Sequence, residues 1–250
     1  MEIVCISNWK GGVGKTTTAL ALAGSLAQLL PTQRVVLADL DPQGNATSGL
    51  GCQTGSGTGS GRWLAGTDDL ERHLVSTAVP GLDLLPADDE LRALRASPEA
   101  IAYRLRLGLR GKPGLMVADT PPSLHPTTHG VLLAASAVVI PVQPDPYSAI
   151  GLFEVLADVE TLRGTTKPRL LRVLRVEWEP RLVEAQGFDG VLRERVPDLL
   201  LPAIPRNIAV RRAIHRGLPV TVAEPRSSAA IAYDEVTREV LRAWRPVMTA

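Results

Sequence analysis

The segment NWKGGVGKTTT, residues 8–18, constrains the fold and chemistry of this chain more than any other feature. It follows a short apolar run and precedes a longer segment of helical period, which is the strand–loop–helix context of a phosphate cradle. Gly11, Gly12 and Gly14 let backbone amides converge on one point, because a Cβ would block that approach. The segment therefore predicts a phosphate-binding loop, and a glycine-rich turn without a ligand fits it poorly.

The loop departs from the usual pattern G-x-x-x-x-G-K-[ST] at one position. Trp9 stands where the first glycine belongs, and a second lysine, Lys10, follows it. In such a loop Lys15 is placed to reach the β- and γ-phosphates, and the Thr16 hydroxyl is placed to ligate Mg²⁺. The start of the following helix adds its N-terminal dipole and its free N–H groups. These residues predict a site for a magnesium nucleotide.

The composition is that of a globular protein, with 250 residues, 21% charged and 45% hydrophobic. The two cysteines, Cys5 and Cys52, form no C-x-x-C pair, so neither a disulfide framework nor an iron–sulfur cluster is expected, and a reducing cytoplasm is the simplest setting. We expect no signal peptide, because no charged segment and long apolar segment open the chain. No apolar run approaches transmembrane length.

Apolar runs of strand length alternate along the chain with segments of helical period. Strands are expected at residues 3–7, 34–39, 82–87, 114–119, 137–143, 169–176, 199–205 and 220–224, and helices at 16–30, 88–109, 148–164 and 227–245. Strands that are apolar on both faces and separated by helices indicate a mainly parallel sheet. We therefore predict a doubly wound α/β fold of about eight strands with helices on both faces. It forms a single domain over residues 1–250, without an N-terminal helix-turn-helix, and the glycine-rich segment 49–61 is an excursion from it.

The sequence KGGVGKTT, residues 10–17, resembles the deviant Walker A motif of the ParA/MinD group of P-loop ATPases. That group has a lysine directly after the position at which the usual pattern fails, so Trp9 does not mark a damaged site. The resemblance implies that Lys10, the signature lysine, reaches across a dimer to the nucleotide of the partner. The nucleotide-binding residues expected here are Lys10, Gly11, Gly12, Val13, Gly14, Lys15, Thr16 and Thr17.

Two further segments carry carboxylates at the ends of expected strands. Residues 35–51, VVLADLDPQGNATSGLG, resemble the Walker A′ segment of the ParA/Soj branch, and residues 114–124, GLMVADTPPSL, resemble Walker B. Carboxylates at such strand ends can hold metal-bound water or orient the water that attacks the γ-phosphate. The resemblance implies that Asp41 orients the water, whereas Asp39 and Asp119 join Thr16 at the magnesium. Asp41, Lys10 and Lys15 are the expected catalytic residues.

The C-terminal block, residues 203–236, resembles that of Soj-type proteins, which implies that Pro205 and Asn207 line an adenine pocket. Residues 172–181 do not follow the family, because Glu177, Trp178 and Glu179 replace a polar segment that helps to frame the base. The details of base recognition therefore stay open.

Soj-like proteins bind DNA non-specifically as ATP dimers, through basic residues on one face. The candidates here are Arg193, Arg195, Arg206, Arg211, Arg212 and Arg216. Arg211 and Arg212 fall in a short expected helix with Arg216 four to five residues on, so these side chains can share a surface. Binding of phosphates would be salt-dependent. The alternative is that these arginines are scattered and merely solvated.

The resemblance implies a cytoplasmic, nucleoid-associated ATPase that partitions chromosome or plasmid DNA. It would be weakly active alone, form an ATP-dependent homodimer and be stimulated by a ParB-like partner. One alternative is a ParA-like ATPase that positions a protein cargo or the division machinery, possibly at a membrane. The C-terminal segment 234–250 has three acidic and three basic residues, which disfavours a membrane-binding helix. A metabolic ligase of the same fold is disfavoured by the DPQGN and IPRN segments.

Overall fold

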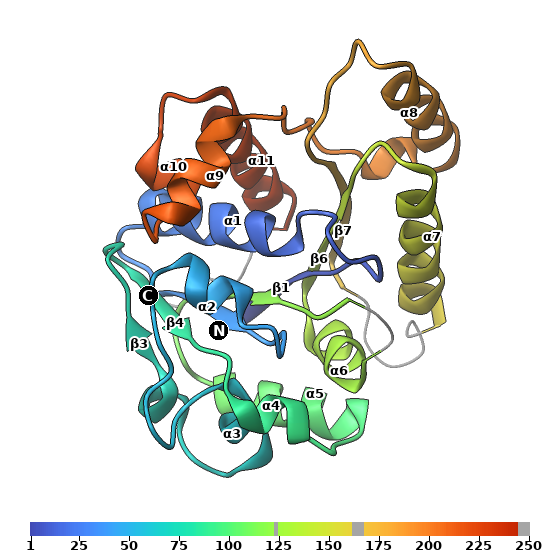
Figure 1. Cartoon of the computed structure of the whole chain (residues 1–250). Coiled ribbons are helices and arrows are strands. Elements are labelled where there is room, and N and C mark those ends of the chain that lie inside the picture. The colour runs from blue at the N-terminus through green and yellow to red at the C-terminus, as the bar shows by residue number, and fades with distance from the viewer. Residues whose placement is uncertain (123–124, 162–167, 245–250) are drawn as a thin grey trace.

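The computed structural model describes residues 1–122, 125–161 and 168–244. Within these residues one seven-stranded sheet has the order β3-β4-β2-β5-β1-β6-β7, and only the edge strand β3 is antiparallel to its neighbour. The strands are β1 (Glu2–Ile6), β2 (Val35–Asp39), β3 (Val75–Ser76), β4 (Leu82–Leu85), β5 (Leu115–Asp119), β6 (Ala137–Val142) and β7 (Leu170–Arg175). The predicted doubly wound α/β fold is confirmed (Figure 1).

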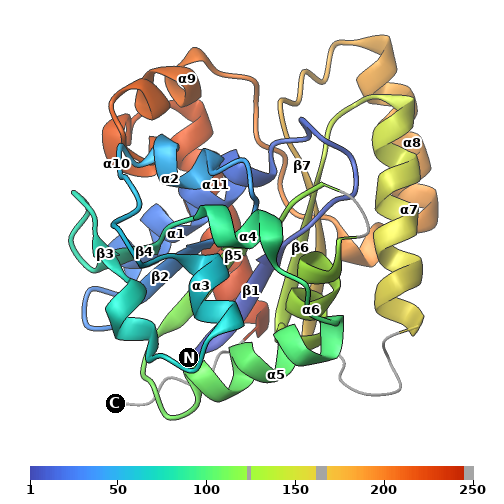
Figure 2. The ribbon, with the colours of Figure 1, turned by 60° about the horizontal axis from the view of Figure 1, so that its bottom comes forward.

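Helices cover both faces of this sheet (Figures 1 and 2). One face carries α1 (Lys15–Leu29), α2 (Asn45–Gly49), α9 (Ile208–His215), α10 (Val220–Ala223) and α11 (Ser228–Trp244). The other carries α3 (Ser60–Ala65), α4 (Asp89–Ala93), α5 (Pro98–Leu109), α6 (Pro126–Ala134), α7 (Pro146–Thr161) and α8 (Val183–Arg195). Within the described ranges, two short 3-10 helices, Leu70–His73 and Pro197–Leu199, lie in the connections.

The alternation of side chains along each strand divides the core into two layers. Val4 and Ile6 of β1 pack with α1 and α11, whereas Ile3 and Cys5 pack with the helices on the opposite face. Both sets are almost completely buried, which explains why the central strands read as continuous apolar runs. No helix in the described part of the chain is long and apolar enough to span a membrane.

Two of the predicted strands are wrong. Residues 199–205 make only isolated bridges, from Leu200 to Val173 inside β7 and from Pro205 to Trp178 beyond it. Pro202 and Pro205 lack the amide hydrogen that a ladder needs. Residues 220–223 form the short helix α10, which begins directly after Pro219. The predicted helix over 88–109 is two helices, because Ser97 caps α5 and Pro98 begins it. Residues 123–124, 162–164 and 245–250 of the predicted segments lie outside the described residues.

Candidate nucleotide-binding site

The carboxyl ends of three adjacent strands bring the predicted phosphate loop and two carboxylates together. Asp119, at the end of β5, is in register with Ile6 at the end of β1 and with Asp39 at the end of β2. The loop 8–14 leaves β1 at this edge and leads into α1. A doubly wound sheet places its ligands at this edge, so the fold assembles the site from segments that are far apart in the sequence.

The loop has the backbone conformation that its glycines permit. Gly12 and Gly14 have φ values of 79° and 82°, in the left-handed region that other residues avoid. A Cβ at Gly14 would also approach Val176 to 3.2 Å. No side chain caps α1, so the amides of its first turn are available to an anion.

Lys15 is buried at the first position of α1, and its Nζ donates a hydrogen bond to the Lys10 carbonyl at 2.8 Å. Burial lowers the pKa of Lys15, and the nearby Asp119 and Asp41 carboxylates oppose that effect. A desolvated ammonium within a glycine loop is suited to bind phosphate oxygens, because their charge replaces the lost hydration.

Asp39 is buried but well supplied with hydrogen bonds. It accepts from the backbone N–H and the hydroxyl of Thr47, both at 2.7 Å, and from the Asp41 N–H at 3.3 Å. Burial nevertheless raises the pKa of Asp39 to about 6, with a further contribution from Asp41. The site therefore holds negative charge that the folded protein accommodates at a cost.

Asp119 is fully buried, and neither of its oxygens has a hydrogen-bond partner of normal geometry among the described residues. Burial and then the Asp39 carboxylate raise the pKa of Asp119 well above its usual value, although the nearby Thr16 hydroxyl and Lys15 lower it. An unpartnered carboxylate beside a threonine hydroxyl fits a divalent cation. In the part of the chain that is described, no three His, Cys, Asp or Glu residues could hold a metal alone, so the remaining Mg²⁺ ligands would be phosphates and water.

Asp41 and the loop line one side of a cavity of about 450 Å³. One Asp41 oxygen accepts a hydrogen bond from the Gln43 N–H at 2.9 Å, which fixes the carboxylate at the cavity wall. The described lining residues are Gly11, Gly12, Gly14, Lys15, Thr16, Thr17, Leu20, Asp41, Gln43, Asn45, Ser48, Pro122, Glu177 and Ile214. The cavity has the position of a triphosphate site, since the phosphate loop and Lys15 line it.

A second cavity, of about 200 Å³, contains both residues predicted at the base. Pro205 and Asn207 line it, together with Val176, Ile204, Ile208, Val210 and Tyr233. Asn207 caps α9: its Oδ1 accepts from the Ala209 N–H at 2.8 Å, and its Nδ2 donates to Ser228 Oγ at 2.8 Å. The two cavities share Gly14, Thr17 and Glu177, so a nucleotide can occupy both. Tyr233 could not be predicted from the sequence, because an aromatic residue inside an amphipathic helix carries no signal of a ligand.

Comparison with known proteins shows the family to which the chain belongs. A family model described as an AAA domain matches residues 1–172. The chain is 38% identical over 242 residues to the chromosome-partitioning ATPase Soj of Thermus thermophilus, covering 95% of this chain and 94% of that protein. The chain belongs to the ParA/Soj family of P-loop ATPases.

Solved structures with the same fold hold nucleotides. A Cyanothece McdA variant in complex with ATP has a TM-score of 0.84 and 21% identity, covering 100% of this chain and 98% of that chain. Cobyrinic acid a,c-diamide synthase from Mycobacterium smegmatis, with bound ADP and magnesium, has a TM-score of 0.79 and 29% identity, covering 100% of this chain and 98% of that chain. These structures show the fold, and the curated relatives and the family model confirm the family resemblance predicted from the phosphate loop.

Lys10, the second lysine of the phosphate loop, is paired within its own chain here. Lys10 forms an ion pair with Asp145, which precedes α7, and its backbone N–H donates to Asn8 Oδ1 at 2.9 Å. Trp9 packs edge-on against His129 of α6, with ring centroids 6.1 Å apart. His129 Nε2 lies 2.7 Å from an oxygen of Asp158 in α7. These contacts hold the start of the ParA/Soj-type loop against α6 and the N-terminal end of α7.

The arginines predicted to bind DNA fall into two groups, one at the end of α8 and one in and around α9, and these helices are apart in Figure 1. Several of them form ion pairs. Arg193 pairs with Asp189, Arg206 with Glu179 at 3.1 Å, and Arg212 and Arg216 both approach Glu224, at 3.7 and 3.4 Å. Arg206 and Arg211 also line the base cavity. The single basic face that the ParA/Soj resemblance implied is thus divided between two helices.

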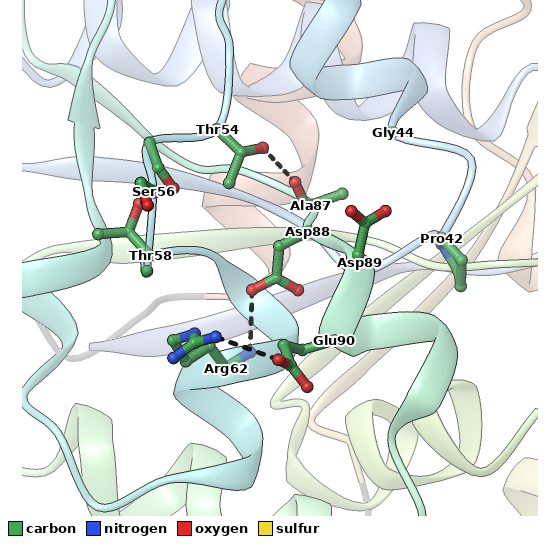
Figure 3. Close-up of a pocket in the computed structure, with 12 residues that line it drawn as sticks. Pro42, Gly44, Thr54, Ser56, Thr58, Arg62, Ala87, Asp88, Asp89 and Glu90 are labelled. Carbon is green, nitrogen blue, oxygen red and sulfur yellow. Dashed lines mark hydrogen bonds and ion pairs between the residues drawn. The ribbon is translucent and has the colours of Figure 1, made fainter.

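A third cavity, of about 580 Å³, is larger than either nucleotide cavity but lies beside the glycine-rich excursion (Figure 3). Two of its acidic side chains, Asp88 and Glu90, already have hydrogen-bond or ion-pair partners within the protein. Asp88 accepts from the backbone N–H groups of Gly61 and Arg62, and the Arg62 side chain pairs with Glu90 at 3.1 Å. Size alone therefore does not identify the site, whereas the phosphate loop does.

Proposed function

We propose that this protein is a magnesium-dependent ATPase that partitions chromosome or plasmid DNA and works on the nucleoid. The observation that carries the proposal is the phosphate loop, which has a second lysine, Lys10. Gly12 and Lys15 of this loop line the same cavity as Asp41. The identity to the Soj protein over nearly the whole chain supports the same conclusion.

Each site residue has a role that its position supports. Lys15 and the amides of the loop bind the β- and γ-phosphates, while Pro205 and Asn207 line the cavity that holds the base. Thr16, Asp39 and Asp119 would hold Mg²⁺, which neutralises phosphate charge when bound. Asp41 orients the attacking water, because the Gln43 N–H holds one of its oxygens and leaves the carboxylate facing the cavity.

ATP brings two subunits together in this proposal, with Lys10 of each completing the site of the other. For this, the Lys10 side chain leaves Asp145 and turns toward the partner. It is favourable for the Lys10 ammonium to exchange the Asp145 carboxylate for a triphosphate, since the phosphates carry more negative charge. A ParB-like partner stimulates hydrolysis, and the dimer then separates and releases DNA.

The DNA-binding face of the dimer is assigned to the arginines around α9. Four of the six candidates, Arg206, Arg211, Arg212 and Arg216, lie in or beside this helix and are exposed. Their acidic partners are surface residues, and ion pairs of this kind contribute at most about 1 kcal/mol. Phosphates can therefore displace them, which adds counterion release to the binding energy.

The test is binding to random-sequence duplex DNA with ATP, ADP or no nucleotide, over a series of salt concentrations. Binding only with ATP, weakening steeply as salt rises, is the expected result. Intact ATP hydrolysis without DNA binding in any state would overturn the partition function and favour the positioning of a protein cargo, possibly at a membrane.

The likeness to the diamide synthase raises a second candidate, an ATP-dependent ligase. A ligase couples ATP cleavage to an acid and an amine donor, whereas a partition ATPase hydrolyses ATP without either. ATP turnover in the absence of any second small-molecule substrate, accelerated by DNA and a partner protein, would exclude the ligase.

A further inference from the structure

Glu177 has a backbone conformation that a side chain of its size rarely adopts. It follows β7 and has a φ of 51°, the one positive value among the described non-glycine residues. Its two neighbours hold this conformation in place, since the Val176 N–H donates to Val142 at 2.8 Å and the Trp178 N–H to Ile204 at 2.9 Å. Such a conformation is strained for a residue with a Cβ and is found preferentially at functional sites.

The packing of Trp178 explains why the chain cannot relax at this point. The indole is buried, lies under the Arg175 guanidinium at 5.4 Å and contacts Phe188 with centroids 6.3 Å apart. Turning Glu177 into a relaxed conformation would pull this ring out of the core. The backbone therefore holds Glu177, and the direction of its Cα–Cβ bond, at one place.

That place is the junction of the two nucleotide cavities. Only Gly14, Thr17 and Glu177 among the described residues line both, and Glu177 alone of these three carries a charge. Glu177 also lines the base cavity together with the buried Tyr233. After burial, its charge is a further cause of the raised Tyr233 pKa of about 12.

A nucleotide with its phosphates at the loop and its base beside Pro205 must pass its sugar along this junction. We propose that the Glu177 carboxylate accepts hydrogen bonds from the ribose hydroxyls and makes the site selective for ribonucleotides over deoxyribonucleotides. This inference rests on the proposed nucleotide-binding function.

The chemistry of the sugar suits a carboxylate. An ionised carboxylate only accepts hydrogen bonds, and the 2′- and 3′-hydroxyls offer two adjacent donors. The sugar carries no charge, so it does not repel Glu177 as a phosphate would. Asn207 is a poorer candidate, because its amide oxygen and nitrogen already bond Ala209 and Ser228. Charge-assisted hydrogen bonds of this kind are strong enough to change affinity at least about tenfold.

The experiment compares the dissociation constants of ATP, 2′-deoxy-ATP, 3′-deoxy-ATP and GTP with magnesium. The proteins are the wild type, Glu177→Gln, Glu177→Ala and the control Glu184→Gln, whose exposed carboxylate lies outside both cavities. Thermal unfolding of each variant checks that it is folded.

The wild type and the Glu184 variant should bind ATP at least about tenfold more tightly than one of the deoxy analogues. Glu177→Ala should remove that preference by weakening ATP alone, and Glu177→Gln should retain part of it. Equal affinity of the wild type for ATP and both deoxy analogues would overturn the inference, as would an unchanged preference in Glu177→Ala. A Glu177→Ala change confined to the ATP-to-GTP ratio would also overturn it, by assigning the carboxylate to the base. Absence of nucleotide binding by the wild type would instead overturn the proposed function itself.

Discussion

At the scale of single residues, the site is built from charges that folding buries before any ligand neutralises them. Asp39 and Asp119 lie on adjacent strands with their Cα atoms in register, and after burial the Asp39 carboxylate is a further cause of the raised pKa of Asp119. Buried like charges of this kind destabilise the nucleotide-free protein and create a strong preference for a cation.

The cost of burying the Asp39 carboxylate can be measured from the pH dependence of the free energy of unfolding. Its pKa in the folded protein is about 6, against 3.8 ordinarily, a difference worth about 3 kcal/mol. The folded state therefore binds this proton more tightly than the unfolded state, so the group's contribution to stability is lost as pH rises from about 4 to about 6. Urea unfolding of nucleotide-free protein should show this decline in the wild type and in the exposed control Asp198→Asn, but a smaller one in Asp39→Asn. Equal declines in all three would contradict it.

Lys10 supports a prediction about assembly. Lys10→Ala should keep the affinity of the monomer for ATP, because the loop amides and Lys15 remain. It should lose ATP-driven dimerisation, which light scattering measures directly. Lys112→Ala, which removes a lysine paired with Asp69 and Glu71, is the control. A Lys10→Ala protein that still dimerises with ATP would show that the lysine does not act across the dimer.

At the scale of elements, α9 shapes the base cavity and depends on a single cap. Asn207 begins the helix with its side chain, ties it to α11 through Ser228, and lines the cavity at the same time. Asn207, which was predicted to line the base cavity, therefore also stabilises α9.

Asn207→Ala should lower the free energy of unfolding by about 1 kcal/mol, the usual cost of losing an N-cap. It should also weaken ATP binding, because Pro205 and Ile208 on either side would no longer be held. Asn207→Asp keeps the capping oxygen and should retain most of the stability. Denaturant unfolding and calorimetric titration measure the two effects, and an Asn207→Ala protein as stable as the wild type would refute the role of the cap.

At the scale of the whole molecule, the fold separates the two groups of arginines. Those at the end of α8 lie on the helix layer opposite to α9 and its neighbours. The six side chains of a subunit therefore do not share one helix layer, and the two groups can be tested against each other.

The paired change Arg212→Ala with Arg216→Ala should weaken ATP-dependent DNA binding. It should also reduce the slope of log affinity against log salt by about 2, since each lost phosphate contact contributes about 0.9. The pair Arg193→Ala with Arg195→Ala should leave both quantities near the wild-type values. Filter binding over a salt series measures them, with ATP affinity as the check that the site is intact. A larger loss for the α8 pair would move the DNA face to that helix.

The sequence alone determined the parts of this protein whose chemistry is local. The glycines and lysines of residues 10–17 carry their own backbone freedom and charge, so the phosphate loop was predicted from one segment. Long apolar runs separated by helical periods predicted the parallel sheet, because strands buried on both faces need no alternation. The strands predicted at 199–205 and 220–224 were wrong because a short apolar run without alternation is compatible with a strand, a loop or a helix. Only the packing of its neighbours decides between them.

The tertiary structure decided what depends on residues far apart in the chain. Strand order placed Asp39 beside Asp119, so only the folded sheet reveals a shared, unneutralised charge. The contact of the segment after β7 with residues 204–208 and Tyr233 built the base cavity and turned Glu177 toward it. Electrostatic fields and cavities depend on distance in space, and no local pattern in a sequence specifies that distance.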